Sequence, residues 1–172
     1  MVKRWPKRLK EEAGAVSDFP PIWQSEFVIA QSGLIARSFK QFVRRDLLPG
    51  NPPGPGLAHR VFTAPFVVVS HGTEADPVLN YGNQAALNLW EMSWEEFTRT
   101  PSRLTAEAPR QEERAQLLEI AARRGFIDNY SGVRISKSGR RFEMRRATIW
   151  NLVSETGRPR GQAAAFSEWK FL

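Results

Sequence analysis

Two histidines, His59 and His71, are the only side chains of this chain whose ordinary pKa suits general-base chemistry near neutral pH. His71 opens a segment, residues 71–76, that also holds Glu74 and Asp76. A serine hydrolase would need a nucleophile as well, and no Gly-x-Ser-x-Gly elbow is present. Polar side chains in such a loop commonly hold a turn through local hydrogen bonds. The sequence therefore favours a structural role for this segment and predicts no catalytic residue.

The residues that hold metals and cofactors are equally scarce. The chain has no cysteine, which excludes disulfides, thiolate metal sites, cysteine-dependent flavin attachment and c-type haem attachment. No cluster of His, Asp and Glu has the spacing of a metal site, and residues 83–124 contain no histidine that could ligate haem. Neither a GxGxxG motif nor a phosphate-binding loop occurs. The sequence thus requires no cofactor and predicts no metal site.

Composition predicts one folded domain. The chain has 172 residues, of which 41% are hydrophobic and 25% charged, so it can bury a core. It has no apolar run of about 18 residues and no apolar core of a secretory signal near its start. We therefore expect no membrane association and a cytoplasmic location.

The net charge of +7 is concentrated in the last third of the chain. Residues 121–172 carry eleven positive and four negative charges, a net +7, whereas residues 13–120 carry a net −3. A basic sheet of this kind could meet nucleic acid, an acidic partner or an anionic ligand, or could simply be solvated. No RNP-type signature or helix-turn-helix accompanies the basic residues, so nucleic acid is the least favoured partner.

Pro and Gly clusters divide the chain into segments. Residues 1–22 form a flexible basic tail, residues 23–48 an amphipathic helix, residues 49–56 a Pro/Gly linker and residues 57–172 the main domain. The helix must bury its apolar face either on its own sheet or against a second copy. Its candidate interface residues are Phe27, Leu34, Ile35, Phe39 and Phe42.

The main domain has the order strand, strand, short helices, long helix and three strands. Strands are predicted for residues 66–70, 78–81, 127–136, 141–153 and 161–169. Asn83 and Ser93 are N-caps for two short helices, and Gly125 ends a long helix that begins near Pro109. This order is typical of an α+β domain with an antiparallel sheet of about five strands.

The amino-acid sequences of several segments are similar to those of one family. The segments HGTEADP, NYGNQAALNLWEMSWEEFT, PSRLTAE, GFIDNYSGVRIS, SGRRF and WNL resemble the MEKHLA domain, a PAS-related family. Members occur alone in bacteria and at the C-terminus of plant class III homeodomain-leucine-zipper proteins, and this chain resembles the stand-alone bacterial type. The resemblance implies a PAS-like fold with short helices on one face of the sheet and an N-terminal helical extension. It also implies a sensing or pairing role, and the plant proteins associate the domain with dimerisation.

A ligand pocket is expected between the sheet and the short helices. Strict alternation would place Phe142, Met144, Trp150 and Leu152 on one face of the strand 141–153. Residues 163–165 are all alanine, which leaves room beside them either for a large core side chain such as a tryptophan or for a ligand. The candidate pocket residues are Asn80, Asn83, Trp90, Asp128, Tyr130, Arg134, Trp150 and Ala164.

The sequence therefore predicts a non-enzymatic PAS-like sensory or interaction module. It would bind a small ligand between the sheet and the helices and act through a homodimer or an unidentified partner protein. The alternative is a small cofactor-binding protein or enzyme that uses the same pocket.

Overall fold

The computed structural model describes residues 20–50, 53–107 and 111–172. Residues 1–19 of the predicted basic tail lie outside the described residues. So does residue 109, where the long helix is predicted to begin. The helical elements are η1 (Ile22–Gln24), α1 (Glu26–Val43), α2 (Pro55–Phe62), α3 (Gln84–Trp90), α4 (Trp94–Phe97), η2 (Ser102–Thr105) and α5 (Gln111–Arg124). The strands are β1 (Val67–His71), β2 (Leu79–Gly82), β3 (Phe126–Ile135), β4 (Arg141–Val153), β5 (Pro159–Phe166) and β6 (Glu168–Phe171).

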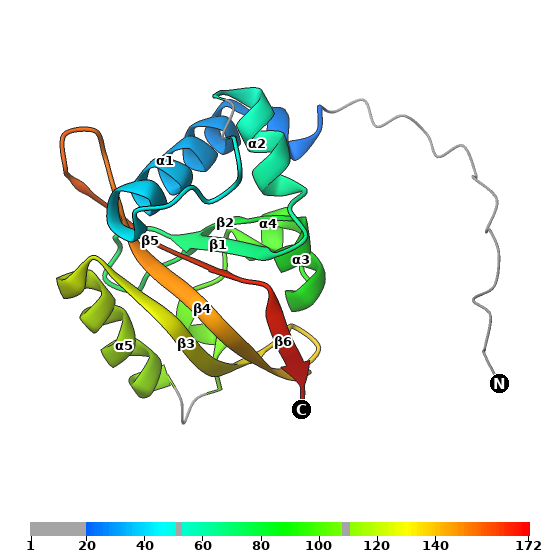
Figure 1. The fold of residues 1–172 in the computed structure, drawn as a ribbon. Helices are drawn as coiled ribbons and strands as arrows, with labels where there is room; N and C mark the ends of the chain where they lie inside the picture. Colours follow the sequence, from blue (N-terminus) through cyan, green and yellow to red (C-terminus); the bar gives the residue numbers. More distant parts are fainter. Residues whose placement is uncertain (1–19, 51–52, 108–110) are drawn as a thin grey trace, which may run out of the picture.

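The strands form one antiparallel sheet in the order β2-β1-β5-β4-β3 (Figure 1). The α+β class and the antiparallel sheet are as predicted, but the described residues form six strands. The segment predicted as one last strand divides at Ser167, because β5 pairs with the second half of β4 and β6 pairs with its first half. The end of the chain thereby extends the sheet beside the start of β4.

A bulge at Arg146 turns β4 over. Arg146 has a φ of 51°, in the left-handed region that a residue with a Cβ seldom adopts. Phe142 and Met144, before the bulge, pack with α3, whereas Trp150 and Leu152, after it, pack with α1. The strict alternation predicted for this strand is therefore wrong. We call the two sides of the sheet the α3 face and the α1 face, after these contacts.

Helix α1 folds back onto its own sheet. Ser25 caps its first turn by accepting a hydrogen bond from the amide three residues later, and the helix ends at Arg44, whose φ is 64°. Ile35 and Phe39 are buried on the α1 face, where the Phe39 and Trp150 rings lie 4.8 Å apart. The Trp150 indole N–H donates to the carbonyl of Ile35 at 3.3 Å. Each large apolar side chain buried in this way contributes about 1.5–3 kcal/mol.

The α3 face is covered by α3, α4, η2 and α5. Both predicted N-caps are confirmed: Asn83 caps α3, and Ser93 with Glu96 forms a capping box at α4. Gly125 ends α5 with a φ of 92°, and its amide donates to the carbonyl of Ala121 at 2.8 Å. These local signals set where each helix meets the sheet.

The side chain of Asn83 holds three segments together. It is fully buried, and its Oδ1 accepts from the amides of Val68 at 3.0 Å and Ala86 at 3.1 Å. Its Nδ2 donates to the carbonyls of Phe66 at 2.7 Å and Val61 at 3.2 Å. One buried side-chain amide thus bonds to backbone groups in α2, in α3 and at the start of β1.

Replacing Asn83 should therefore cost far more than the loss of a helix cap. Asn83→Ala is expected to lower the free energy of unfolding by about 3–5 kcal/mol, because buried backbone groups in three segments lose a hydrogen bond at once. Asn83→Asp keeps the two accepting bonds but places a carboxylate oxygen against the carbonyls of Phe66 and Val61, so it should be destabilising as well. Urea denaturation measures both, with Asn88→Ala, an exposed residue of the same helix, as a control expected to stay within about 0.5 kcal/mol. An Asn83→Ala variant as stable as that control would contradict this role.

Candidate functional site

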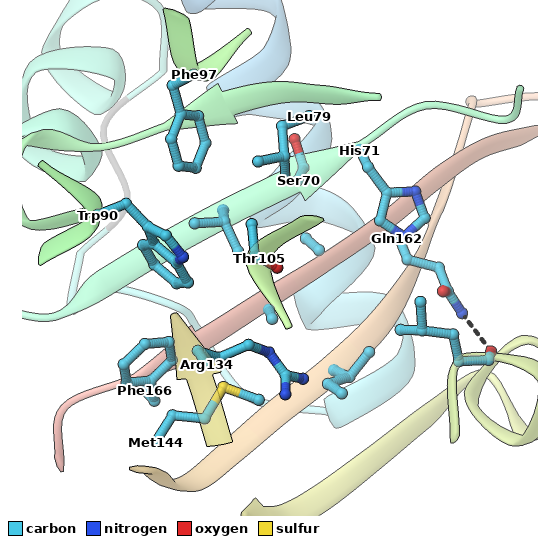
Figure 2. Close-up of a pocket in the computed structure, with 15 residues that line it drawn as sticks. Ser70, His71, Leu79, Trp90, Phe97, Thr105, Arg134, Met144, Gln162 and Phe166 are labelled. Atoms are coloured by element: carbon cyan, nitrogen blue, oxygen red, sulfur yellow. Dashed lines mark hydrogen bonds between the residues drawn. The ribbon is translucent and has the colours of Figure 1, made fainter. Parts of the chain in front are cut away.

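A small cavity lies between the α3 face and the helices that cover it (Figure 2). Its volume is about 60 Å³, enough for a few water molecules or a ligand of similar size. Its apolar walls are contributed by both the sheet and the helices. They include Leu79, Trp90, Phe97, Met144, Ile149 and Phe166.

Two polar residues of the wall, His71 and Gln162, are bound to the protein around them. The Nδ1 of His71 lies 2.8 Å from the carbonyl oxygen of Gly72, and since a carbonyl only accepts, Nδ1 is the nitrogen that carries the donated hydrogen. The side-chain amide of Gln162 donates to the carbonyl of Leu118 at 2.9 Å and to Asn151 at 3.1 Å. Gln162 therefore fixes α5 against the end of the cavity.

Trp90 points a hydrogen-bond donor into this space. Its side chain is 3% exposed, and within the described part of the chain its indole N–H has no hydrogen-bond acceptor. The ring is held by edge contacts with Phe142 and Phe97, whose centroids lie 5.2 Å and 6.0 Å away. A buried donor without an acceptor costs about 1–3 kcal/mol. Because these contacts hold the ring, the indole N–H stays directed into the cavity without an acceptor.

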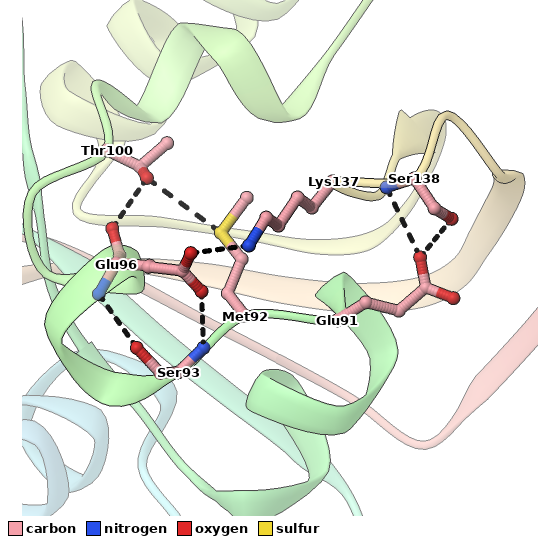
Figure 3. Close-up of polar contacts among 7 residues, drawn as sticks. All are labelled: Glu91, Met92, Ser93, Glu96, Thr100, Lys137 and Ser138. Carbon is pink, nitrogen blue, oxygen red and sulfur yellow. Dashed lines mark hydrogen bonds and ion pairs between the residues drawn. The ribbon is translucent and has the colours of Figure 1, made fainter.

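The turn between β3 and β4 is fastened to the residue that follows Trp90 (Figure 3). Glu91 adopts a left-handed φ of 59°, and its carboxylate accepts hydrogen bonds from the hydroxyls of Ser136, at 2.7 Å, and Ser138. Arg140 adds an ion pair at 3.4 Å. These hydrogen bonds, with that from Ser136 the strongest, lower the pKa of Glu91 to about 2.

A second link joins the same turn to α4. The backbone amide of Lys137 donates to the carbonyl of Trp90 at 3.0 Å, and its ammonium pairs with the carboxylate of Glu96. The hydrogen bond from Lys137 is the main cause that lowers the pKa of Glu96. Because both links meet at Trp90, the turn helps to hold the indole in its place on the cavity wall.

The structure brings three of the eight sequence-derived pocket residues to this cavity. Trp90, Arg134 and Ala164 line it. Asn83 does not, because its side chain is consumed by the four backbone hydrogen bonds described above. The Oδ1 of Asn80 accepts hydrogen bonds from Ser70 of β1 at 2.6 Å and from Gln31 of α1 at 3.4 Å.

The remaining three lie outside the wall. Asp128 accepts a hydrogen bond from Thr148 at 2.6 Å, and Trp150 is buried on the α1 face. Tyr130 lies beside the cavity, where its hydroxyl is 3.4 Å from the guanidinium of Arg134. These positions follow from the bulges in β3 and β4, which the sequence did not reveal.

The candidate interface residues of α1 have different surroundings. Leu34, Ile35 and Phe39 are buried within the chain, and Phe42 is half-buried beside Gly125. Phe27 is 52% exposed. Of these five side chains, Phe27 alone presents a large apolar surface to a second molecule.

Sequence reasoning missed most of the cavity wall. Met144, Phe166, Phe97 and Thr105 all line it, yet none of them is among the eight candidate pocket residues. Alternation in β1 and β4 carried a partial signal, but the bulge at Arg146 interrupts it. The helix residues of the wall had no signal beyond ordinary apolar periodicity.

Two further kinds of site were searched for over the described residues. No group of three His, Asp or Glu side chains there could hold a metal ion. None of the helices in residues 20–50, 53–107 and 111–172 is long and apolar enough to cross a membrane.

Comparison with known families decides the classification. The MEKHLA domain family matches residues 29–171, from within α1 to the end of β6. The chain belongs to the MEKHLA domain family. No curated protein matched the chain significantly.

Solved structures establish the fold of this MEKHLA domain as PAS-like. A PAS domain from Colwellia psychrerythraea shares 12% identity with a TM-score of 0.57, over 67% of this chain and 92% of that one. A light-oxygen-voltage domain studied with a flavin analogue shares 17% identity with a TM-score of 0.53, over 68% and 84%. The light-state dimer of the fungal photoreceptor Vivid shares 18% identity with a TM-score of 0.50, over 77% and 93%.

The cavity of this MEKHLA domain does not fit a flavin. Its volume of about 60 Å³ is far below the roughly 300–1,000 Å³ of sites for drug-sized ligands. Trp90, Met144 and Phe166 occupy the space around it, and the chain has no cysteine for a flavin adduct. The residues present leave room for a much smaller molecule.

The hydrogen bonds and the ion pair that Glu91 forms with the β3–β4 turn predict a distinct pH dependence of stability. Because folding lowers the pKa of Glu91 from 4.5 to about 2, its stabilising effect is complete above pH 4.5 and is lost as the pH falls toward about 2. Glu91→Gln should lower the urea midpoint at neutral pH and flatten its fall between pH 4.5 and about 2. Glu95→Gln, an exposed neighbour on α4, is the control. If the urea midpoint of Glu91→Gln changed with pH in parallel with that of the wild type, this stabilising role of Glu91 would be contradicted.

Proposed function

We propose that this MEKHLA domain is a non-enzymatic sensory module that binds a small ligand in the cavity between the α3 face and the helices. The observation that carries the proposal is the buried indole N–H of Trp90, which lines the cavity and has no acceptor within the described residues. Cavities that are only packing defects are apolar and stay empty. A rigid donor on the wall instead favours an occupant that accepts a hydrogen bond.

The sheet offers a route from the cavity to α1. It is one residue thick, so Ile149 and Ala164 line the cavity while their neighbours Trp150 and Ala165 pack on the α1 face. The hydrogen bond from Trp150 to the carbonyl of Ile35 connects that face directly to α1. A ligand that shifts β4 or β5 would therefore change how α1 is seated.

We propose that the output is a change in assembly between copies. Phe27, on α1, borders a surface groove that also contains Arg37, Glu155 and Arg160. A groove that holds an exposed aromatic side chain and both signs of charge can pair with its own copy about a two-fold axis. The dimeric state of Vivid, a structure with the same fold, supports this use of the fold.

Filling the cavity should abolish ligand binding. Ala164→Leu places a larger side chain into the space, and overpacking should cost about 1–3 kcal/mol of stability. Ala165→Leu overpacks the α1 face and serves as the matched control. Thermal unfolding with a panel of small acids, amides and alcohols should show stabilisation of wild type and Ala165→Leu by at least one compound, and none for Ala164→Leu. A panel without effect on the wild type, together with a native mass of the bare chain, would refute the proposed function.

The assembly proposal predicts a specific effect at Phe27. Light scattering should give the wild type twice the chain mass of 19.6 kDa, and Phe27→Asp should weaken the dimer at least tenfold. Leu104→Asp, at a similarly exposed residue on η2, should leave the mass unchanged. A wild type that stays monomeric at all accessible concentrations, or a Phe27→Asp variant that dimerises like the wild type, would overturn it.

A further inference from the structure

Arg134 is a buried cation that pairs with no carboxylate among the described residues. It belongs to β3 and lines the cavity, and its side chain is only 6% exposed. The ion pairs formed within the described part of the chain do not include it. A guanidinium stays charged under all ordinary conditions, and a buried charge is normally paired.

The hydrogen-bond partners of Arg134 among the described residues are neutral. Its Nη1 donates to the carbonyl of Val133 at 2.8 Å, and its Nη2 donates to the hydroxyl of Tyr130 at 3.4 Å. The Tyr130 ring lies beneath the guanidinium, 5.6 Å from its carbon. These contacts orient the side chain but leave its charge uncompensated.

The guanidinium and the indole N–H of Trp90 point into the same space. Figure 2 shows both groups directed toward the middle of the lining residues, with Phe166 and Met144 in the lower part of the view. Two donors, one of them charged, therefore face a cavity whose remaining walls are mostly apolar. Thr105, also on the wall, donates its hydroxyl hydrogen to the carbonyl of Ser102 at 2.7 Å, so it offers no third donor to the cavity.

These features together specify the chemistry of the occupant. The donors call for an anionic oxygen group, and the planar fork of a guanidinium suits a carboxylate. The apolar walls call for a hydrocarbon part, and the volume of about 60 Å³ limits its length. A fully hydrated inorganic anion would find no apolar complement here and would leave these walls without contacts.

We infer that the cavity binds a short-chain monocarboxylate, with Arg134 as its counter-charge and the Trp90 N–H as a second donor. This inference rests on the proposed function and defines the ligand class of the same site. The hydrocarbon end of the acid lies against Met144 and Phe166. The carboxylate of such an acid compensates the charge of the buried guanidinium, which stays protonated. Binding to the folded protein therefore stabilises it against unfolding.

Pairs of acids and their amides test the inference on the full chain. Thermal unfolding is followed with acetate, propionate and butyrate, and with acetamide, propionamide and butyramide, at constant ionic strength set with sodium chloride. At least one acid should raise the unfolding temperature, at a concentration at least tenfold below that of its amide. Inorganic phosphate serves as the test for a general anion site.

The outcomes distinguish failure of the monocarboxylate inference from failure of the proposed function. Equal responses to an acid and its amide would overturn the monocarboxylate and leave the proposed function standing, as would a stronger response to phosphate than to any acid. No response to any compound, with no bound mass in native mass spectrometry, would overturn both. Selective stabilisation by an acid supports both.

Variants at Arg134 separate ligand recognition from structure. Arg134→Met removes the unpaired charge, so the ligand-free protein should unfold at the same or a higher temperature while the response to acids disappears. Arg158→Gln, at an exposed arginine in the β4–β5 turn, should keep that response unchanged. An Arg134→Met variant that retains the selective response would refute the assignment.

A second readout guards against a variant that fails to fold. Propionate or the best acid should change the tryptophan emission of the wild type, because Trp90 contacts the ligand, and Trp90→Phe should lose that part of the change. Arg134→Lys keeps the charge without the planar fork and should bind the acid at least tenfold more weakly. Emission changes that persist fully in Trp90→Phe would contradict the placement of the ligand.

Discussion

The left-handed residue Arg146 is the constraint on which the two-sided architecture depends. Before it, β4 turns Phe142 and Met144 toward α3; after it, the strand turns Trp150 and Leu152 toward α1. One strand thus supplies core side chains to both faces of the sheet. The same residue separates the half of β4 that pairs with β6 from the half that pairs with β5. The cavity, the seat of α1 and the position of the chain end all follow from this single break in the pleat.

Local signals made most of the fold predictable. Capping residues such as Ser93, the helix-ending Gly125 and the turn at Ser138 each act through neighbouring backbone, so they can be read without knowledge of the tertiary structure. The bulge could not be read in this way, since arginine in a left-handed conformation has no sequence signature. The division of the last predicted strand at Ser167 depends on the same bulge, and was missed with it.

The candidate site was harder to predict because polarity is a poor guide to a small cavity. Asn83 attracted attention as a polar residue in a suggestive place, but its hydrogen bonds are all used to hold the backbone together. Met144 and Phe166 look like ordinary core residues in the sequence, although they shape the space. Arg134 was named among many arginines, and its burial, which distinguishes it from the others, exists only after β3, β4 and the helices have come together.

Gly161 shows how the backbone and the cavity place separate demands on this sequence. Its φ is 119°, and a Cβ there would lie 1.8 Å from the carbonyl oxygen of His71, so no side chain fits whatever the cavity holds. We therefore expect glycine at this position in any relative whose backbone follows the same path. The cavity wall carries no such backbone demand, so its side chains can change without disturbing the close approach at Gly161. Relatives can therefore share the glycine and the shape of the domain while their cavity walls differ.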